Sequence, residues 1–131
     1  MIRHCSELDI CDRFAALAAD TVAKRAGECT KEGRLDRESW QEMSDAGVRR
    51  LAVPAKWGGE DGSWWDFVAA FEGMATDGTD LGFCLSVVAQ AGLIRSLITY
   101  GTDEQRAYWL PRLLNGEAGA TAVSAEEARN A

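Results

Sequence analysis

The sequence contains few of the side chains from which active sites are most often built. It has a single histidine, His4, so a Ser-His-Asp type of nucleophilic site would depend on this one imidazole near the terminus. It has four cysteines but no C-x-x-C pair, so neither a zinc site nor a redox dithiol is indicated. The pattern is typical of reduced thiols in a cytosolic protein. The cysteines are Cys5, Cys11, Cys29 and Cys84.

Positive charge is also scarce. The chain has 14 Lys and Arg residues against 21 Asp and Glu residues, which gives a formal net charge of −7. Its densest basic clusters are pairs such as Lys24-Arg25 and Arg49-Arg50. Attraction to nucleic acid or to an anionic membrane needs the opposite balance of charge. We therefore expect no nucleic-acid partner.

Long hydrophobic runs are absent as well. The longest, Leu81 to Ile94, already contains Gln90 and is shorter than the ~20 residues that a bilayer requires. The segment Met1 to Arg13 carries acidic residues where a secretory signal has an uninterrupted apolar stretch. The sequence thus predicts a cytoplasmic protein with no membrane partner.

What the sequence does contain is the composition of one globular domain. Of its 131 residues, 47% are hydrophobic and 27% charged, which is enough apolar surface to build a core without a disulfide or metal. Apolar residues recur at helical spacing in five segments. The expected helices span about 7–29, 37–46, 63–77, 81–100 and 102–115.

Four of these helices begin at side chains suited to cap a helix, the first of them at Ser6, where Ser6-Glu-Leu-Asp9 fits the start signature. Asp36 precedes the second helix, while Ser63 and Thr102 each open a capping box whose second member lies three residues further on. The segment Val48 to Val53 is expected to be an extended linker. The fourth helix is apolar on all its sides, which predicts that other helices surround it.

The end of the chain has a different pattern. From Ala120 to Ser124 the residues are small and β-branched without a helical period, which predicts the start of a β-strand. The fold class is therefore all-α, a compact domain of about five helices over residues 1–119. Residues 120–131 form the start of a truncated β-domain strand and a tail.

No single motif assigns a chemistry. The glycines that follow Trp57 form neither a P-loop nor a dinucleotide fingerprint, so a turn is the simpler interpretation. The adjacent carboxylates Glu126 and Glu127 are expected to face water. Packing on apolar helix faces explains three of the five tryptophans and leaves Trp57 and Trp65 open.

Two sequence blocks, in their order and spacing, resemble the amino-terminal helical domain of acyl-CoA dehydrogenases. They are Val53-Pro54-Ala-Lys-Trp57-Gly58-Gly59 and Tyr100-Gly-Thr-Asp-Glu-Gln-Arg-Ala-Tyr-Trp-Leu-Pro-Arg-Leu-Leu-Asn-Gly-Glu117. The similarity extends from about Asp9 to Ser124. In that family a β-barrel and a carboxy-terminal four-helix bundle follow the helical domain, and FAD lies among them and the neighbouring subunit.

The resemblance implies a reaction and the residues that would take part in it. A carboxylate removes the α proton of an acyl thioester while the β hydride passes to the flavin. That carboxylate belongs to the carboxy-terminal bundle, so no catalytic residue is assigned here. Leu85, Val88 and Ala89 are candidate residues of the acyl pocket, although filling the core would explain them equally well.

The resemblance also implies a cofactor contact. Val123 and Ser124 match the place where the first barrel strand meets the flavin through its backbone and a hydroxyl group. Arg129 departs from the family pattern, because relatives have a glycine there that lets the backbone approach the cofactor.

Three hypotheses follow. In the first, the chain is part of a flavoenzyme that oxidises an acyl thioester of CoA or a carrier protein to its α,β-enoyl form. FAD and the base then come from a dehydrogenase-like partner subunit, a homo-oligomer or a missing region. In the second, the chain is a non-catalytic helical interaction or regulatory module. In the third, it is one piece of a longer dehydrogenase.

Overall fold

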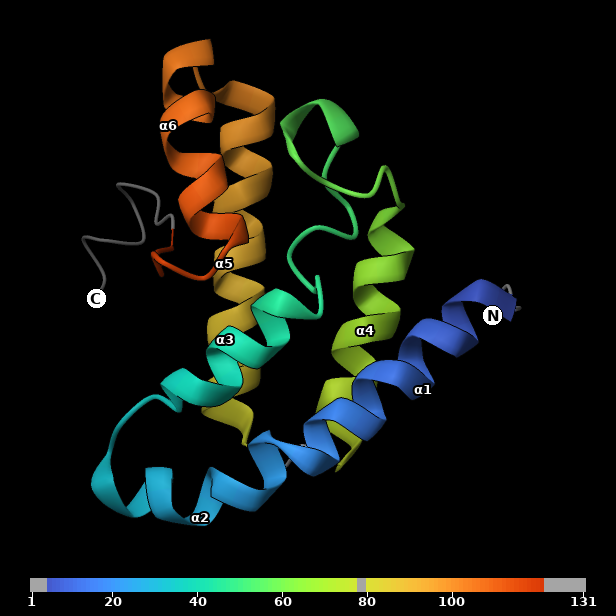
Figure 1. Cartoon of the computed structure of the whole chain (residues 1–131), viewed down its shortest axis with the longest axis vertical. Coiled ribbons are helices and arrows are strands. Elements are labelled where there is room, and N and C mark those ends of the chain that lie inside the picture. The colour runs from blue at the N-terminus through green and yellow to red at the C-terminus, as the bar shows by residue number, and fades with distance from the viewer. Residues whose placement is uncertain (1–4, 78–79, 122–131) are drawn as a thin grey trace, which may run out of the picture.

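The computed structural model describes residues 5–77 and 80–121, and in these ranges every regular element is helical (Figure 1). The predicted all-α fold class is confirmed, with six α-helices in place of five. The elements are α1 (Cys5–Asp20), α2 (Val22–Glu32), α3 (Arg37–Asp45), the 3₁₀ turn η1 (Ala55–Trp57), α4 (Trp64–Asp77), α5 (Leu81–Tyr100) and α6 (Asp103–Leu114).

The additional helix arises because the first predicted helix is broken at Thr21. This residue has φ −119° and ψ −82°, outside the helical region, and the helix resumes at Val22. The Thr21 hydroxyl donates to the carbonyl of Leu17 at 2.7 Å. The Thr21 N–H keeps its own bond to the same carbonyl at 3.0 Å, and an added hydroxyl bond of this kind often bends a helix. The prediction of one continuous helix over 7–29 was therefore wrong.

Three of the four predicted helix starts are confirmed, and the one at Ser6 was wrong because Ser6 lies inside α1. The Asp36 carboxylate accepts from the Ser39 backbone N–H at 3.1 Å. The Ser63 hydroxyl accepts backbone N–H groups at the start of α4. Thr102 and Gln105 form a complete capping box at the start of α6. These side chains satisfy backbone donors that a helix end leaves without partners.

The segment from Val48 to Val53 forms consecutive turns, so the expected extended linker was wrong. The N–H of Arg50 bonds to the Gly47 carbonyl at 2.8 Å, and the N–H of Val53 to the Arg50 carbonyl at 3.1 Å. The turns bury Val48, Leu51 and Val53, which join this loop to the core. A run of six residues is too short for its apolar pattern to distinguish turns from an extended segment.

Helix α1 lies across α4 in Figure 1, and one glycine allows their close approach. A Cβ atom built at Gly73 would overlap the backbone carbonyl oxygen of Cys11. The interface also buries Phe14, Ala18 and Met74. The largest apolar cluster of the domain therefore begins between these two helices.

Helix α5 connects the two apolar clusters of the domain. Its buried side contributes Phe83 and Val87 to the cluster with α1, α3 and α4, and Ile94 to a cluster with α6. Its opposite side is exposed and includes Leu81 and Leu85. The prediction that other helices surround this helix was therefore correct for one side only.

Helix α5 is also longer than the apolar run seen in the sequence. An 18-residue stretch of α5 has a mean hydropathy of 1.7, so by length and composition the helix could cross a membrane. It is the one such helix in the part of the chain that the structure describes. The core helix of a soluble protein meets the same criterion, and α5 packs against α4 and α6.

The chain after α6 remains close to the helices. Gly116 to Thr121 have no regular structure, and neither Ala120 nor Thr121 belongs to a strand among the described residues. Val123 and Ser124, predicted to meet the flavin, lie outside the described residues, as does the remainder of the expected strand.

Candidate functional site

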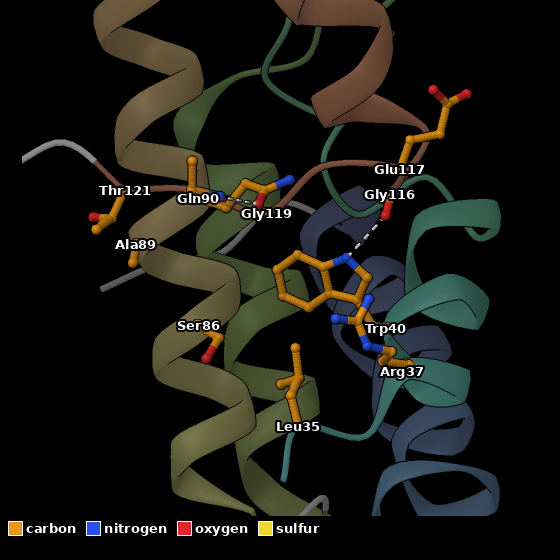
Figure 2. Close-up of a pocket in the computed structure, with 11 residues that line it drawn as sticks. Leu35, Arg37, Trp40, Ser86, Ala89, Gln90, Gly116, Glu117, Gly119 and Thr121 are labelled. Carbon is orange, nitrogen blue, oxygen red and sulfur yellow. Dashed lines mark hydrogen bonds between the residues drawn. The ribbon is translucent and has the colours of Figure 1, made fainter.

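A groove of about 370 Å³ lies between the start of α3, the middle of α5 and the segment that follows α6 (Figure 2). It contains Ala89, one of the residues predicted to line an acyl pocket. Apolar and polar groups alternate along it. The lining residues are Leu35, Arg37, Trp40, Ser86, Ala89, Gln90, Gly116, Glu117, Gly119, Ala120 and Thr121.

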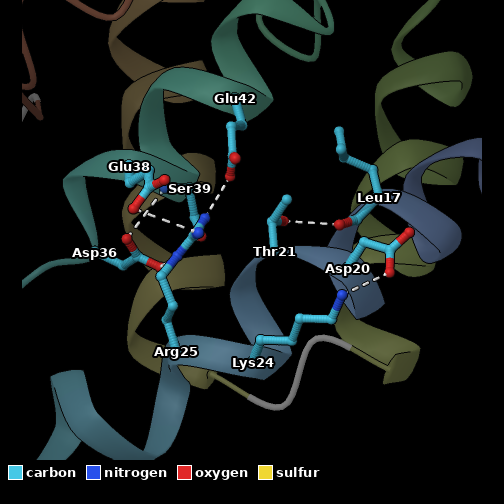
Figure 3. Close-up of polar contacts among 9 residues, drawn as sticks. All are labelled: Leu17, Asp20, Thr21, Lys24, Arg25, Asp36, Glu38, Ser39 and Glu42. Carbon is cyan, nitrogen blue, oxygen red and sulfur yellow. Dashed lines mark hydrogen bonds and ion pairs between the residues drawn. The ribbon is translucent and has the colours of Figure 1, made fainter.

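The position of α3 beside this groove depends on a charged cluster behind it (Figure 3). The Arg25 guanidinium, from α2, pairs with Asp36 at 3.0 Å and with Glu38 at 3.4 Å, and it also contacts Glu42. Burial alone would raise the pKa of Asp36, but hydrogen bonds from Ser39 and Arg25 outweigh it and lower that pKa. The ionised carboxylate therefore joins α2 to the start of α3.

Trp40 forms one wall of the groove, and three contacts fix its ring. The indole Nε1 donates to the Gly116 carbonyl at 3.2 Å, as Figure 2 shows. The ring packs edge-on against Phe83, with centroids 6.2 Å apart. The guanidinium carbon of Arg49 lies 3.8 Å from the ring centroid. The wall is therefore rigid and ties α3 to the segment after α6.

Arg49 is the least satisfied charge near this wall. It is 3% exposed, and its Nε and Nη2 atoms have no hydrogen-bond partner among the described residues. Burial lowers the pKa of its guanidinium to about 10, so it remains charged at neutral pH. Its contacts are the Ser44 hydroxyl and the Trp40 ring.

Gln90 holds the far edge of the groove. The side chain is 1% exposed and uses both ends of its amide. Its Nε2 donates to the carbonyls of Leu113 at 2.9 Å and Ala118 at 3.1 Å, and its Oε1 accepts from the Ala120 N–H at 3.2 Å. A buried polar residue in an apolar helix thus fixes the path of the segment that follows α6.

The three predicted pocket residues lie on the outward side of α5 but not in one cavity. Ala89 lines the groove described above, whereas Val88 lines a second groove of about 390 Å³ between α4 and α5. Leu85 is 56% exposed and lines neither groove. Their filling of the core, the alternative interpretation, does not hold for Leu85 and Val88, both of which are exposed.

The titratable groups near the groove do not form a proton-transfer site within the described residues. Arg37 and Glu117 lie exposed at its rim. Burial, with a smaller contribution from Asp80, raises the pKa of the Cys84 thiol, which disfavours a reactive thiolate. No cluster of His, Cys, Asp and Glu that could hold a metal is found in ranges 5–77 and 80–121. The arrangement is suited to binding an apolar group beside polar ones.

Reasoning from the sequence missed the residues that shape the groove. Gln90 was visible only as an interruption of an apolar run, and its partners could not be identified. Trp40 was expected to pack on an apolar face, which it does, but its bond to Gly116 had no signal in the sequence. Trp57 packs against the cluster around α6, while Trp65 remains 54% exposed on α4.

Comparison with protein families gives a match over most of the chain. The model described as acyl-CoA dehydrogenase, N-terminal domain, matches residues 6–117. The chain is 26% identical over 119 residues to the mitochondrial short/branched chain specific acyl-CoA dehydrogenase of Bos taurus. This alignment covers 90% of the chain and 27% of that protein.

Other relatives show the same partial coverage. Mitochondrial isovaleryl-CoA dehydrogenase of Pongo abelii is 31% identical over 114 residues, which cover 84% of this chain and 26% of that protein. The 3-sulfinopropanoyl-CoA desulfinase of Cupriavidus necator is 30% identical over 118 residues, with 90% and 28% covered. The chain thus spans little more than a quarter of the length of these relatives.

Solved structures share the fold. A chain from work on the electron transferring flavoprotein of Acidaminococcus fermentans superposes with a TM-score of 0.79 at 22% identity, covering 91% of this chain and 31% of that one. The prolyl acyl carrier protein oxidase AnaB superposes with a TM-score of 0.76 at 23% identity, covering 90% and 32%. At these identities the likeness concerns the fold alone.

Proposed function

This chain belongs to the family of acyl-CoA dehydrogenase amino-terminal domains, and from that premise we propose that it supplies one wall of a flavin-dependent acyl thioester dehydrogenase. The substrate would be an acyl chain on CoA or on a carrier protein, oxidised to its α,β-enoyl form. The carboxylate base and the flavin would come from another chain or from a region beyond this sequence.

The observation that carries the proposal is the outward side of α5. Leu85 and Val88 present apolar surface to solvent, and Ala89 next to them lines a groove that also has polar groups. An acyl thioester has the same two parts, an apolar chain and a polar head. A preformed apolar wall with a few polar groups is the usual form of a small-molecule site.

The described residues do not fit a complete FAD site. The groove of about 370 Å³ is near the lower end of the range for ligand pockets, about 300–1,000 Å³, and FAD is a full dinucleotide. Val123 and Ser124, which the resemblance assigns to the flavin, lie outside the described residues. We therefore assign residues 5–77 and 80–121 to the acyl side only.

The contribution of this chain to the reaction would be binding and exclusion of water. Apolar side chains such as Leu85 would remove the acyl chain from solvent, which orients the carbons that react. A drier site strengthens the hydrogen bonds and charges that the partner contributes. FAD held by the assembled enzyme would supply the hydride acceptor. We expect this assembly to be cytoplasmic.

Reconstitution tests the proposal. The chain would be co-purified with a dehydrogenase-like subunit encoded beside its gene, and flavin absorbance and acyl thioester oxidation would be measured with an artificial electron acceptor. We expect turnover by the mixture and none by the chain alone. Leu85→Asp should lower kcat/KM roughly tenfold or more, because one buried leucine contributes about 1.5–3 kcal/mol.

A matched control is Leu8→Asp, which alters a leucine of similar exposure on α1, far from the groove. It should leave kcat/KM unchanged. A stable complex that contains the chain but gives no flavin absorbance and no turnover would contradict the proposal and favour a non-catalytic interaction module. Stoichiometric FAD on the isolated chain would contradict the assignment to the acyl side only.

A further inference from the structure

One side of α5 forms an apolar strip in solvent. Leu81, Leu85 and Val88 are 71%, 56% and 37% exposed and succeed one another at helical spacing. Gly92 and Arg95 continue the same line. An 18-residue stretch of the helix has a mean hydropathy of 1.7, yet only 33% of it is buried. A contiguous exposed apolar patch of this kind is often functional.

Helix α4 widens this strip. It runs antiparallel to α5 (Figure 1). The second groove lies between the two helices and has almost entirely apolar walls. Two apolar side chains of α4 are also exposed: Val68, which lines this groove, is 42% exposed, and Trp65 is 54% exposed. The opposite side of α5 is held in the core by Phe83 and Ile94, so α5 cannot leave the domain as a lone membrane span. A protein surface is therefore the occupant that fits.

We propose that, in the free chain, a second copy covers this face through a two-fold axis at Val88. Val88 lies midway between Leu81 and Arg95 along α5. An axis perpendicular to the helix and lying in the interface makes the two α5 helices antiparallel and places Val88 against Val88 of the second copy. The same operation sets α4 against α4.

The shape of the strip matches itself in this arrangement. Leu85 of one copy lies within one residue, about 1.5 Å along the helix, of the level of Gly92 of the other. A Cβ atom built at Gly92 meets no other atom within 4 Å, so the space beside it is open. The Leu85 side chain therefore fits into the open space beside Gly92, and the two-fold symmetry forms this contact twice.

The charges also match. Arg95 stacks on Trp64, with its guanidinium carbon 4.9 Å from the ring centroid, and no described carboxylate forms an ion pair with it. In the antiparallel arrangement Arg95 faces Leu81 and Asp80 of the second copy. One Asp80 oxygen accepts from the Phe83 N–H at 2.8 Å, which leaves the other for the guanidinium. A parallel pair would instead oppose Arg95 to Arg95.

The expected dimer is weak. From Leu81 to Arg95 the strip is about 21 Å long, and two helices are about 20 Å wide. This area is below the roughly 800 Å² per partner of a standard interface, so dissociation at micromolar concentrations is expected. The inference does not rest on the proposed function. A dimer of this kind would cover Leu85 and Val88, so it and the acyl-binding assembly exclude each other.

Sedimentation equilibrium of the isolated chain tests the dimer without flavin or substrate. We expect the mass to rise from one chain to two with concentration. Leu85→Lys should raise the dissociation constant at least tenfold, while Leu8→Lys on α1 should leave it unchanged, with circular dichroism showing both variants folded. A monomer at every concentration, or an equal effect of both variants, would overturn the proposal.

Cross-linking tests the axis. In a background with Cys5→Ser and Cys11→Ser, Val88→Cys should form a disulfide-linked dimer on mild oxidation. Leu81→Cys, at the end of the strip and more exposed, should not, because its copies are about 21 Å apart in the antiparallel pair. Cross-linking of both variants would indicate a parallel pair, and cross-linking of neither would exclude contact at Val88. Either result overturns the proposed axis.

Discussion

Arg49 shows at the scale of one residue how a buried charge persists without an ion pair. Its guanidinium stacks on Trp40 and contacts the Ser44 hydroxyl, but two of its nitrogen atoms have no hydrogen-bond partner among the described residues. The cation–π contact offsets part of the cost of burial. The N–H groups of Arg49 that have no partner among the described residues account for the remaining cost of burying the charge.

Replacement of Arg49 by an apolar side chain of similar length is expected to stabilise the fold. Arg49→Met removes the buried charge and retains packing on Trp40, so the free energy of unfolding should rise by about 1–3 kcal/mol. Urea unfolding monitored by tryptophan fluorescence measures this change. Arg50→Met is the control, because Arg50 pairs with the exposed Asn115 and should shift stability by only about 0.5 kcal/mol. A less stable Arg49→Met protein would show that the charge is satisfied.

Asp36 makes stability depend on pH. Its pKa lies below the ordinary value of 3.8, so the folded protein binds this proton less readily than the unfolded chain does. The stabilisation is therefore complete above about pH 5 and is lost as the pH falls through the lowered pKa. Asp36→Asn keeps a capping side chain but loses the ion pair with Arg25. It should be less stable at pH 7 by about 1–2 kcal/mol, with the difference shrinking toward pH 3. A constant difference across this range would exclude the mechanism.

At the scale of the helices, capping residues were good predictors, whereas breaks and turns were not. Asp36, Ser63 and Thr102 begin helices as predicted, because a cap is a local interaction between neighbours in sequence. The break at Thr21 could not be predicted, because a continuous helix through this position fits the same apolar pattern. The turns after Gly47 depend on burial of Val48 and Leu51 against distant residues. Local pattern cannot distinguish such cases.

The crossing of α1 and α4 yields a prediction about glycine. Gly73→Ala places a methyl group against the Cys11 carbonyl, so the helices must separate, and we expect a loss of about 1–3 kcal/mol in the free energy of unfolding. Gly27→Ala makes the same change in α2, where no atom lies within 4 Å, and should stabilise by about 0.5–1 kcal/mol. If the same Gly→Ala change destabilises the protein at position 73 and stabilises it at position 27, the effect of packing is distinguished from that of helix propensity. Two stabilising effects would show that α1 and α4 tolerate a wider spacing.

At the scale of the whole molecule, the sequence predicted the fold class but only part of the site. Ala89 does line a groove, yet the groove exists because Gln90 binds backbone groups of Leu113, Ala118 and Ala120. Those partners lie 23 to 30 positions further along the chain. Spacing within one helix carries no information about contacts at that range. The exposed side of α5 was missed for the same reason, since an apolar helix was assumed to be a covered one.

Because α5 contributes to both apolar clusters, the domain is expected to unfold as a single unit. Met74→Ala in the cluster with α1 and Ile94→Ala in the cluster with α6 should each lower the free energy of unfolding by about 2–5 kcal/mol. In both variants, tryptophan fluorescence and far-ultraviolet circular dichroism should give the same urea midpoint, because loss of either cluster removes support from the shared helix. If Ile94→Ala instead unfolds in two steps, with part of the circular dichroism lost in a transition at lower urea than the main one, then α6 is a separate cooperative unit. The wall that it helps Trp40 and Gln90 to form would in that case be lost before the core between α1 and α4 unfolds.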